Sequence, residues 1–330
     1  MEKIKIAIIG CGAITEKTHL PLLTKSEQFE IRALVDISKD RALQLGEEYG
    51  ISIVTTDYNE ILDKIDAAIL ALPPHINASV STQLMKAGIH VLVEKPMAMT
   101  ARECDDMIQC AEESKVSLMV GLIRRYYPNF ILVKRLLDSG VIGKLVGAHI
   151  QEGNIYKWKI KTDYSFRKDT GGGLLPVIGV HVFDSILWWL GGYESVEYYD
   201  DARGGVEADC AVFLRYEENT NVEIELSRLR DLPNTYIFKG EAGRIEVGFR
   251  FNSPVRINLY ESNNEYIVDH FTNGPADADN LFLSQYKDFA QSIIHGTQPY
   301  INGEEGKRSV ALIEECYNRR QPYIYPWLSE

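Results

Sequence analysis

The first third of the chain alternates short apolar runs rich in Ile and Val with amphipathic stretches, from residue 3 to about residue 121. This pattern is typical of repeated βα units, because the buried strands of a parallel sheet read as continuous apolar runs. Thr100 and Glu103 have the spacing of a capping box at the start of a helix. Asp57 and Glu60 form a related arrangement in which Asp is the cap. The predicted strands of this parallel sheet are residues 4–9, 31–35, 67–72, 90–93 and 118–120.

The pattern changes after about residue 122. A predicted helix over residues 128–139, closed by Gly140, leads into segments in which apolar residues recur at every second position. Since 330 residues correspond to about two domains, we predict an α/β protein with boundaries at 1–122 and 123–330. The second domain is predicted to be α+β with a largely antiparallel sheet. Its predicted strands are residues 211–216, 221–227, 235–239, 244–247, 256–260 and 266–270, and its later helices lie near residues 281–295 and 304–319.

Charge and cysteine content exclude several classes of function. The 35 Lys and Arg against 47 Asp and Glu give a net charge of −12, and no basic run could follow a phosphate backbone, so we expect no nucleic acid partner. The five cysteines are spread out and include no C-x-x-C pair, which favours a reducing cytoplasm over a disulfide framework. The seven histidines show no ligand spacing, so we expect no metal site.

Two apolar stretches bear on membrane association. The N-terminal stretch is short, broken by glycine and followed by Glu16 and Lys17, which indicates a buried strand rather than a signal peptide. Residues 171–192 are long enough to cross a bilayer but contain three consecutive glycines, Pro176 and Asp184. We therefore expect a loop that runs into a buried helix, and no membrane partner.

A glycine-rich segment follows the first predicted strand. Gly10 is placed to make a tight turn, and Gly12 would let the backbone approach a pyrophosphate at the N-terminus of a helix. Thr15 stands where a third glycine is common. Asp36, at the end of the next strand, is the acid expected at a ribose 2′-hydroxyl, although it would equally cap a helix that begins near Ser38. Together these residues predict a dinucleotide site.

Asp36 also bears on the choice of dinucleotide. Its carboxylate would repel the extra phosphate of NADP, which favours NAD. Lys39 and Arg41 follow closely and could offset this repulsion, so NADP stays an alternative cofactor.

Two further side chains are candidates for proton chemistry. Lys95, in Glu94-Lys95-Pro96, follows the predicted strand 90–93 at the edge where ligands bind in open α/β sheets. Burial beside a positive charge would lower the pKa of its amine from about 10.4 and suit it to proton exchange with an alcohol. The alternative is a lysine whose stem packs while its amine is solvated. His181 lies on the apolar helix after the three glycines and is either a core residue or a catalytic one.

A resemblance adds to these interpretations. It is carried by GCGAIT at residues 10–15, by ALPPHINASVSTQLMKAGIHVLVEKPMAMTARE at residues 71–103, by Arg125-Tyr-Tyr-Pro128 with the later Gly140-Val-Ile-Gly143, and by GGG…GVHVFD at residues 171–184. In this order they resemble the Gfo/Idh/MocA family of glucose-fructose oxidoreductase and inositol dehydrogenase relatives. The resemblance covers essentially the whole chain. It implies a Rossmann domain, a second domain with a largely antiparallel open sheet for substrate binding and oligomerisation, and hydride transfer between NAD(P) and a sugar or polyol carbon.

The resemblance also assigns roles to single residues. Lys95 matches the family lysine that contacts the reacting hydroxyl, and His181 matches the histidine near the substrate. The family aspartate four residues before that histidine is replaced by Val177. Leu72 and Asn77 stand where threonine and histidine are common. The expected cofactor-binding residues are Gly10, Cys11, Gly12, Ala13, Ile14, Asp36, Leu72, Pro73, Asn77, Glu94, Lys95 and Arg125.

The loss of the aspartate leaves three explanations. Lys95 and His181 suffice, a tyrosine has taken over, or the site has lost catalysis. Arg167 is a candidate to hold a hydroxyl-rich or anionic substrate, with a surface salt bridge as the alternative. Two functions follow: an NAD(P)-dependent dehydrogenase or ketoreductase of sugars or polyols, or a catalytically silent dinucleotide sensor of the same fold. The resemblance further implies a homodimer or homotetramer. The candidate substrate-binding residues are Tyr126, Tyr156, Tyr164 and Arg167.

Overall fold

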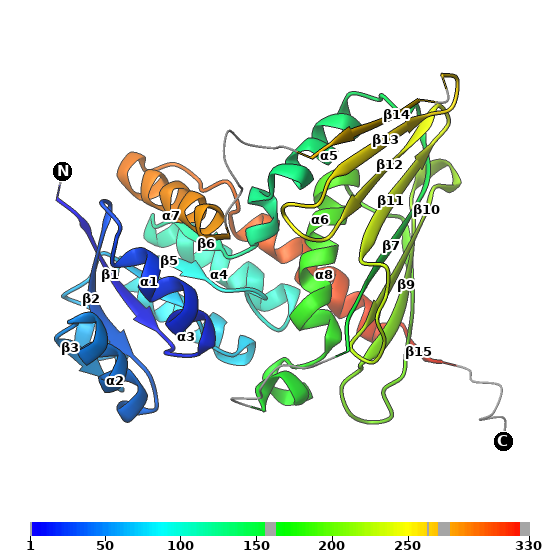
Figure 1. The fold of residues 1–330 in the computed structure, drawn as a ribbon. Helices are drawn as coiled ribbons and strands as arrows, with labels where there is room; N and C mark the ends of the chain where they lie inside the picture. Colours follow the sequence, from blue (N-terminus) through cyan, green and yellow to red (C-terminus); the bar gives the residue numbers. More distant parts are fainter. Residues whose placement is uncertain (1, 156–162, 263, 270–277, 324–330) are drawn as a thin grey trace. The chain divides into compact units, whose positions relative to one another are not determined.

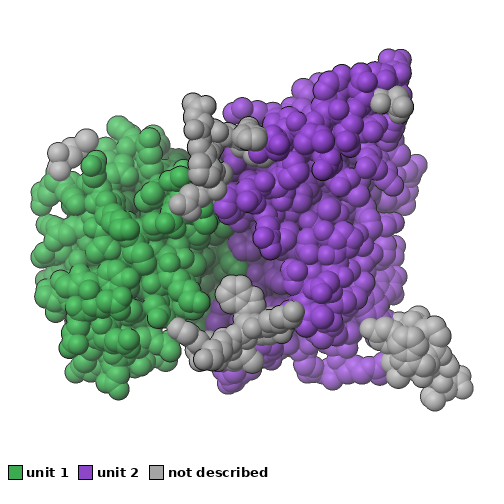
Figure 2. Space-filling view, viewed as in Figure 1, with its two compact units in different colours: residues 1–123, 278–310 green, residues 124–277, 311–330 purple. Residues whose placement is uncertain are grey.

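The computed structural model describes residues 2–155, 163–262, 264–269 and 278–323, which divide into two compact units. The first unit comprises residues 1–123 and 278–310, and the second comprises residues 124–277 and 311–330 (Figure 2). Residues 278–310 were predicted to belong to the second domain, whereas here they pack with the first unit. The physical reason is the apolar face of helix α7 (Ala278–His295), which is buried against the first unit.

The first unit is built on a parallel sheet of six strands in its described residues (Figure 1). The interior strand β1 has Ile6, Ala7 and Ile8 fully buried, as expected for a strand covered on both faces. The strand order is β3-β2-β1-β4-β5-β6, so the carboxyl ends of all six strands meet at one edge. Along the sequence, the strands are β1 (Ile4–Ile9), β2 (Phe29–Val35), β3 (Ile53–Thr55), β4 (Ala67–Leu70), β5 (His90–Val93) and β6 (Leu118–Val120).

All five strands predicted for this unit are present, although β4 ends two residues before the predicted end. The capping box of Thr100 and Glu103 is present at the start of α4. Asp57 accepts from the Asn59 N–H, but it caps only a 3₁₀ turn, η2 (Tyr58–Ile61). Glu60 does not complete a box, because its carboxylate instead accepts from the Thr55 hydroxyl at 2.7 Å. The helices along the chain to this point are α1 (Leu20–Leu23), α2 (Lys39–Tyr49), α3 (Pro74–Lys86) and α4 (Ala101–Ser114).

The returning segment of the chain contributes α7 (Ala278–His295) to the first unit. The ring of Phe289 stacks on that of Phe29 in β2, with ring centroids 6.2 Å apart and both side chains buried. Tyr286, one turn earlier, is also buried against this unit. The apolar face of α7 therefore completes the core around β2. The next helix, α8 (Gly303–Asn318), begins in the first unit and ends in the second.

The second unit is built on a mixed sheet of nine strands in the described residues, in the order β14-β13-β12-β11-β7-β10-β9-β8-β15. Most neighbours are antiparallel, and the pairs β7–β10 and β8–β15 are parallel. Figure 1 shows α5 (Pro128–Asp138) and α6 (Val180–Leu190) along one face of this sheet. The strands are β7 (Leu145–Gly153), β8 (Ser195–Asp200), β9 (Asp209–Arg215), β10 (Asn221–Ser227), β11 (Thr235–Gly240), β12 (Gly243–Gly248), β13 (Val255–Leu259), β14 (Asn264–Val268) and β15 (Arg320–Pro322).

The period-two segments predicted as strands correspond to β9 through β14. In β9, Val212 and Leu214 are buried while Phe213 and Arg215 between and after them are exposed, which explains why the pattern was readable. The last predicted strand ran to His270, which lies outside the described residues. Strands β7, β8 and β15 of this sheet, and β3 of the first unit, were not predicted.

The apolar stretch after the three glycines forms a core helix, as predicted. A π-helical segment, η6 (Leu175–Gly179), continues directly into α6. Residues 168–190 are long and apolar enough to cross a membrane by length and composition, but 72% of the apolar window is buried inside the protein. This burial accounts for the hydrophobicity of the segment.

Candidate active site

The glycine-rich loop joins β1 to a π-helical turn, η1 (Thr15–His19). Gly10 has φ +101°, and a Cβ atom there would lie 2.3 Å from the carbonyl oxygen of Ala71, so only glycine fits. A Cβ on Gly12 would meet no atom within 4 Å, so the backbone at Gly12 borders open space. The hydroxyl of Thr15 is buried and donates to the Gly10 carbonyl at 2.6 Å. Thr15 thus braces the loop from the position where a third glycine is common.

Asp36 ties the end of β2 to this loop. Its Oδ2 accepts from the Cys11 N–H at 2.6 Å and its Oδ1 from the Ser38 N–H at 2.7 Å. The expected cap is not formed, because Ser38 is the N-cap of α2 and no side chain caps this helix. Asp36 instead joins the loop to the residue that precedes the first turn of α2. Burial and the nearby Asp36 raise the pKa of the Cys11 thiol to about 12, so the thiol is inert in this loop.

The Glu94-Lys95-Pro96 segment follows β5 at the same carboxyl edge. The Glu94 N–H donates to the Leu70 carbonyl at 2.8 Å, which fixes the segment to the end of β4. Asn77 is buried in α3, and its Nδ2 donates to the Pro96 carbonyl at 3.1 Å. Its side chain thus supports the lysine segment. Three features fit a dinucleotide bound as in a Rossmann fold. The position of Gly10 excludes a side chain, the backbone of Gly12 borders open space, and Asp36 supplies a carboxylate.

The remaining predicted cofactor residues are placed as follows. Leu72 lies beside Gly10, with its Cδ2 3.2 Å from the position of a Gly10 Cβ. Pro73 is the N-cap of α3. Ala13 and Ile14 are helical and lead from Gly12 directly into η1. Contact of these residues, and of Glu94 and Lys95, with a cofactor stays a prediction.

Arg125 belongs to the second unit, in a 3₁₀ turn, η3 (Ile123–Tyr126). Its guanidinium is buried and makes a bidentate ion pair with Asp184, with Nη2 2.6 Å and Nε 3.0 Å from Oδ1. It also lies over the ring of Trp188, 5.4 Å from the centroid. The aspartate of the GVHVFD motif thus fixes Arg125 to α6. The cofactor contact predicted for Arg125 stays a prediction.

His181 and Val177 lie on the helix formed by η6 and α6, one turn apart and each half-buried. The isopropyl group of Val177 cannot exchange a proton, so the chemistry of this helix face rests on the imidazole. His181 and Lys95 belong to different units.

Two of the three glycines before this helix are required by their surroundings. A Cβ on Gly172 would lie 2.4 Å from the Tyr164 carbonyl oxygen, and one on Gly173 would lie 2.8 Å from both Glu207 Oε1 and the Tyr317 hydroxyl. Gly173 also has φ +134°. The loop therefore wraps closely around a buried carboxylate, that of Glu207.

Glu207 is a residue that the sequence analysis did not identify. Its Oε1 accepts from the Leu175 N–H and from the Tyr317 hydroxyl, each at 2.8 Å. It thereby satisfies a backbone donor at the start of the helix that carries His181. Burial raises the pKa of the Glu207 carboxyl, against the lowering effect of these hydrogen bonds. No local motif surrounds Glu207, so the sequence offered no signal for it.

The candidate substrate residues differ in their surroundings. The side chain of Arg167 is exposed and pairs with Asp169 at 2.6 Å and with Asp163 at 3.7 Å, which is the surface salt bridge weighed in the sequence analysis. Tyr164 is 36% exposed in a 3₁₀ turn, η4 (Tyr164–Phe166). Tyr126 ends η3, and Tyr156 lies outside the described residues.

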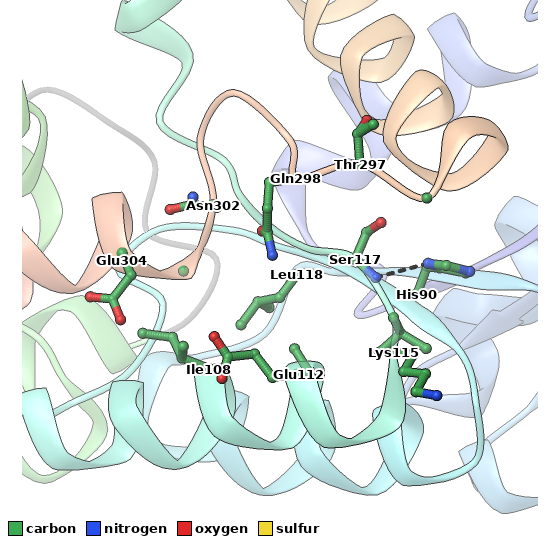
Figure 3. Close-up of a pocket in the computed structure, with 14 residues that line it drawn as sticks. His90, Ile108, Glu112, Lys115, Ser117, Leu118, Thr297, Gln298, Asn302 and Glu304 are labelled. Atoms are coloured by element: carbon green, nitrogen blue, oxygen red, sulfur yellow. Dashed lines mark hydrogen bonds between the residues drawn. The ribbon is translucent and has the colours of Figure 1, made fainter.

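A cavity of about 550 Å³ lies at the other edge of the parallel sheet (Figure 3). It is lined by the amino ends of β5 and β6, where the Ser117 N–H donates to Nδ1 of His90 at 2.9 Å. Glu112 and Lys115, at the end of α4, also border it. Because the glycine-rich loop and Lys95 lie at the carboxyl ends, this cavity is not the dinucleotide site. No cluster of three or more potential metal ligands occurs among the described residues.

Comparisons with known proteins agree with this geometry. A family model described as an oxidoreductase family with an NAD-binding Rossmann fold matches residues 4–122, and the GFO/IDH/MocA C-terminal domain matches residues 130–246. A dTDP-3,4-didehydro-2,6-dideoxy-alpha-D-glucose 3-reductase from Actinomadura kijaniata is 25% identical over 98% of this chain and 97% of its own. A D-glucoside 3-dehydrogenase from Escherichia coli is 25% identical over 66% of this chain and 63% of its own.

Solved structures share the fold. The crystal structure of KijD10, a 3-ketoreductase from Actinomadura kijaniata in complex with NADP and TDP-benzene, superposes with a TM-score of 0.84 at 23% identity, over 98% of this chain and 100% of that one. An oxidoreductase from Thermotoga maritima gives a TM-score of 0.84 at 25% identity, over 96% of each chain. The two family models together cover more than half of the sequence. This chain therefore belongs to the Gfo/Idh/MocA family of NAD(P)-dependent oxidoreductases.

Proposed function

We propose that this protein transfers a hydride between NAD(P) and a carbon of a sugar, a cyclic polyol or a sugar derivative, with Lys95 and His181 handling the proton of the reacting hydroxyl. The observation that carries the proposal is the gathering of the glycine-rich loop, Asp36 and Lys95 at one edge of the parallel sheet. The relatives named above add support, since their names describe reduction or dehydrogenation at a sugar carbon.

Each side chain has a defined task in this proposal. A dinucleotide bound at this edge would supply the hydride for reduction or accept it in oxidation. In reduction the Lys95 ammonium donates a hydrogen bond to the substrate oxygen, stabilises the negative charge that develops there, and gives its own proton to form the alcohol. The His181 imidazole donates to the same oxygen from α6. Because Val177 cannot share a proton with it, this imidazole and Lys95 carry the proton transfer without the family aspartate.

We further propose NAD as the preferred cofactor. Asp36 places a carboxylate at the end of β2, where a ribose 2′-hydroxyl would donate to it and a 2′-phosphate would be repelled. Its hydrogen bond from the Cys11 N–H holds this carboxylate beside the loop. NADP stays the alternative, with Lys39 and Arg41 as cations that follow Asp36 closely along the chain.

The proposal includes a homo-oligomer and a cytoplasmic location. The face of the nine-stranded sheet opposite α5 and α6 exposes apolar side chains, among them Phe213 at 40% and Ile267 at 49%. Pairing of two copies through this face would cover them. All five cysteines are buried and unpaired with one another, which suits a reducing compartment.

The test is NADH formation on a panel of inositols, aldoses, sugar phosphates and nucleotide sugars, with Lys95→Met beside the parent. We expect Lys95→Met to lower turnover by about 10²- to 10⁴-fold, because it removes the proton donor. NADH affinity, read by fluorescence titration, should stay close to that of the parent. Lys86→Met is the control, since Lys86 is an exposed lysine at the end of α3 and should leave turnover unchanged.

Two results would contradict the proposal. Turnover that survives Lys95→Met would remove the lysine from the chemistry. A parent protein that binds NADH but turns over nothing on the panel, in either direction, would favour the dinucleotide sensor, for which Val177 is the supporting observation.

A further inference from the structure

A buried histidine connects the glycine-rich loop to the lysine segment within the first unit. His19 ends the π-helical turn η1 and is fully buried. Its Nδ1 lies 2.7 Å from the hydroxyl of Tyr286 on α7. Its ring also meets the edge of Phe282, with centroids 6.3 Å apart. These contacts fix the plane of the imidazole, so its second nitrogen has one direction available to it.

That second nitrogen faces Glu94. The His19 Nε2 is buried without a hydrogen-bond partner, and the nearest acid is Glu94, whose Oε1 lies 3.4 Å away. The Glu94 carboxylate is confined on its other side, because a Cβ on Gly121 would lie 3.1 Å from its Cδ. Its Oε2 accepts from the Lys95 N–H at 3.3 Å. One carboxylate therefore lies between the imidazole and the peptide that bears the lysine.

The Glu94 carboxylate determines which ring nitrogen carries the hydrogen. A carboxylate only accepts hydrogen bonds, so the nitrogen that faces it, Nε2, carries a hydrogen. The Nδ1 of His19 then accepts from the Tyr286 hydroxyl, which keeps its proton because burial and the nearby Glu94 raise its pKa well above the ordinary value. A buried N–H that faces a carboxylate is stabilised by it, whereas a bare ring nitrogen would repel it.

We propose that His19 is a positioning residue of the dinucleotide site: its Nε2–H holds the Glu94 carboxylate and thereby fixes the lysine segment to the helix that begins at the glycine-rich loop. The pyrophosphate end and the nicotinamide end of the site are thus set by one buried chain of side chains, from Tyr286 through His19 to Glu94. The inference rests on the proposed use of a dinucleotide. It adds that α7, from the returning part of the chain, is needed for full cofactor affinity.

The test compares two substitutions that each keep one half of the histidine. In His19→Gln the side-chain amide nitrogen takes the place of Nε2, so the contact with Glu94 is retained. In His19→Asn the amide takes the place of Nδ1, so only the contact with Tyr286 is retained. We expect His19→Asn to weaken NADH binding by about tenfold in a fluorescence titration, as for loss of one hydrogen bond to a charged group, and His19→Gln to bind within about threefold of the parent.

Ser292→Ala is the control. It removes a buried hydrogen bond from the same helix, that of the Ser292 hydroxyl to the Phe289 carbonyl at 2.8 Å, but leaves His19 and Glu94 as they are. We expect it to lower the thermal midpoint of the cofactor-free protein and to leave NADH affinity near that of the parent. A second measurement needs no variant: ¹⁵N spectra of the cofactor-free parent should give His19 the chemical shifts of the Nε2–H tautomer.

The outcomes separate the inference from the proposed function. Equal NADH affinity in the Asn and Gln variants, or an Nδ1–H tautomer in the parent, overturns the positioning role alone. Equal losses of affinity in all three variants, in step with their thermal midpoints, overturn it as well, because the role would then be structural. A parent protein that binds neither NADH nor NADPH overturns the proposed function itself.

Discussion

At the scale of single residues, the chemistry of this site depends on carboxylates placed by backbone donors. Asp36 receives one hydrogen bond from the glycine-rich loop and one from the start of α2, and Glu94 receives one from its neighbour Lys95. Such hydrogen bonds leave further acceptor positions on each carboxylate. A carboxylate fixed in this way can recognise a ligand without the entropy loss of ordering a flexible side chain.

The first prediction concerns cofactor choice. Asp36→Ala should weaken NADH binding, because a ribose hydroxyl loses its acceptor, and should leave NADPH binding equal or tighter, because a repulsive charge is gone. We expect the ratio of NADH affinity to NADPH affinity to fall by about tenfold. Asp40→Ala is the control, since Asp40 is an exposed acid in the first turn of α2, the helix that follows Asp36. An unchanged ratio in the fluorescence titration would remove Asp36 from ribose recognition.

Residues with a recognisable local motif could be predicted, and those with distant partners could not. Gly10 and Asp36 were found because the loop and the strand end are close in sequence. His19 contacts Tyr286, which is 267 residues away, and Glu207 contacts Tyr317, which is 110 residues away. A single sequence does not show that such distant positions are in contact. The supporting residues of the site therefore required the structure, whereas the residues expected to touch the cofactor did not.

At the scale of elements, the strands that were predicted are those with a clear pattern. The fully buried β4 reads as one apolar run, and β10 alternates buried and exposed positions. Strand β7 was missed because two glycines and several polar side chains interrupt its alternation. Strand β15 has three residues, the last of them proline, and resembles a loop by composition. A strand is thus predicted only where the polarity of its side chains follows its burial, which alternates in β7 although its polarity does not.

The helix formed by η6 and α6 depends on Glu207, and the second prediction tests this. Glu207→Ala should destabilise the second unit by about 1–3 kcal/mol, because the Leu175 N–H and the Tyr317 hydroxyl lose a buried acceptor. Glu207→Gln should not, because its amide oxygen can accept from both. Chemical denaturation at pH 7 measures the difference. Equal losses in the two variants would show that the acceptor is not what stabilises the helix.

The same residue gives a pH dependence with a definite sign. Burial raises the pKa of Glu207 above its ordinary value of about 4.5, so the folded state binds the proton more readily than the unfolded state. Its stabilising contribution is therefore full below about 4.5 and is lost as the pH rises through the folded-state pKa. Glu207→Gln cannot titrate. The free energy of unfolding of the parent relative to this variant should fall as the pH rises above 4.5, and parallel curves would contradict the assignment.

At the scale of the whole molecule, the chain divides at more places than the one where its pattern changes. The change from parallel to period-two strands predicted a single boundary after residue 122, and the first unit indeed ends there along its first pass, at Ile123. Residues 278–310 then rejoin that unit, because the apolar face of α7 packs on β2 through Phe289 and Phe29. The pattern of an amphipathic helix indicates that one face is buried, but it does not indicate which part of the protein covers that face.

The last prediction concerns assembly through the uncovered face of the nine-stranded sheet. Phe213 lies on this face in β9, directly opposite Glu223 of β10 and Glu197 of β8. Phe213→Lys places a cation between these two carboxylates. The new cross-strand ion pairs should preserve the stability of the sheet, while the added charge should disrupt the proposed interface. Leu283→Lys on α7 is the matched control, since both side chains are 40% exposed. In sedimentation velocity the parent and the control should have a multiple of the 37.4 kDa chain mass, and Phe213→Lys should have the mass of one chain. A monomeric parent, or an oligomer that is unchanged by Phe213→Lys, would place the interface elsewhere or remove it.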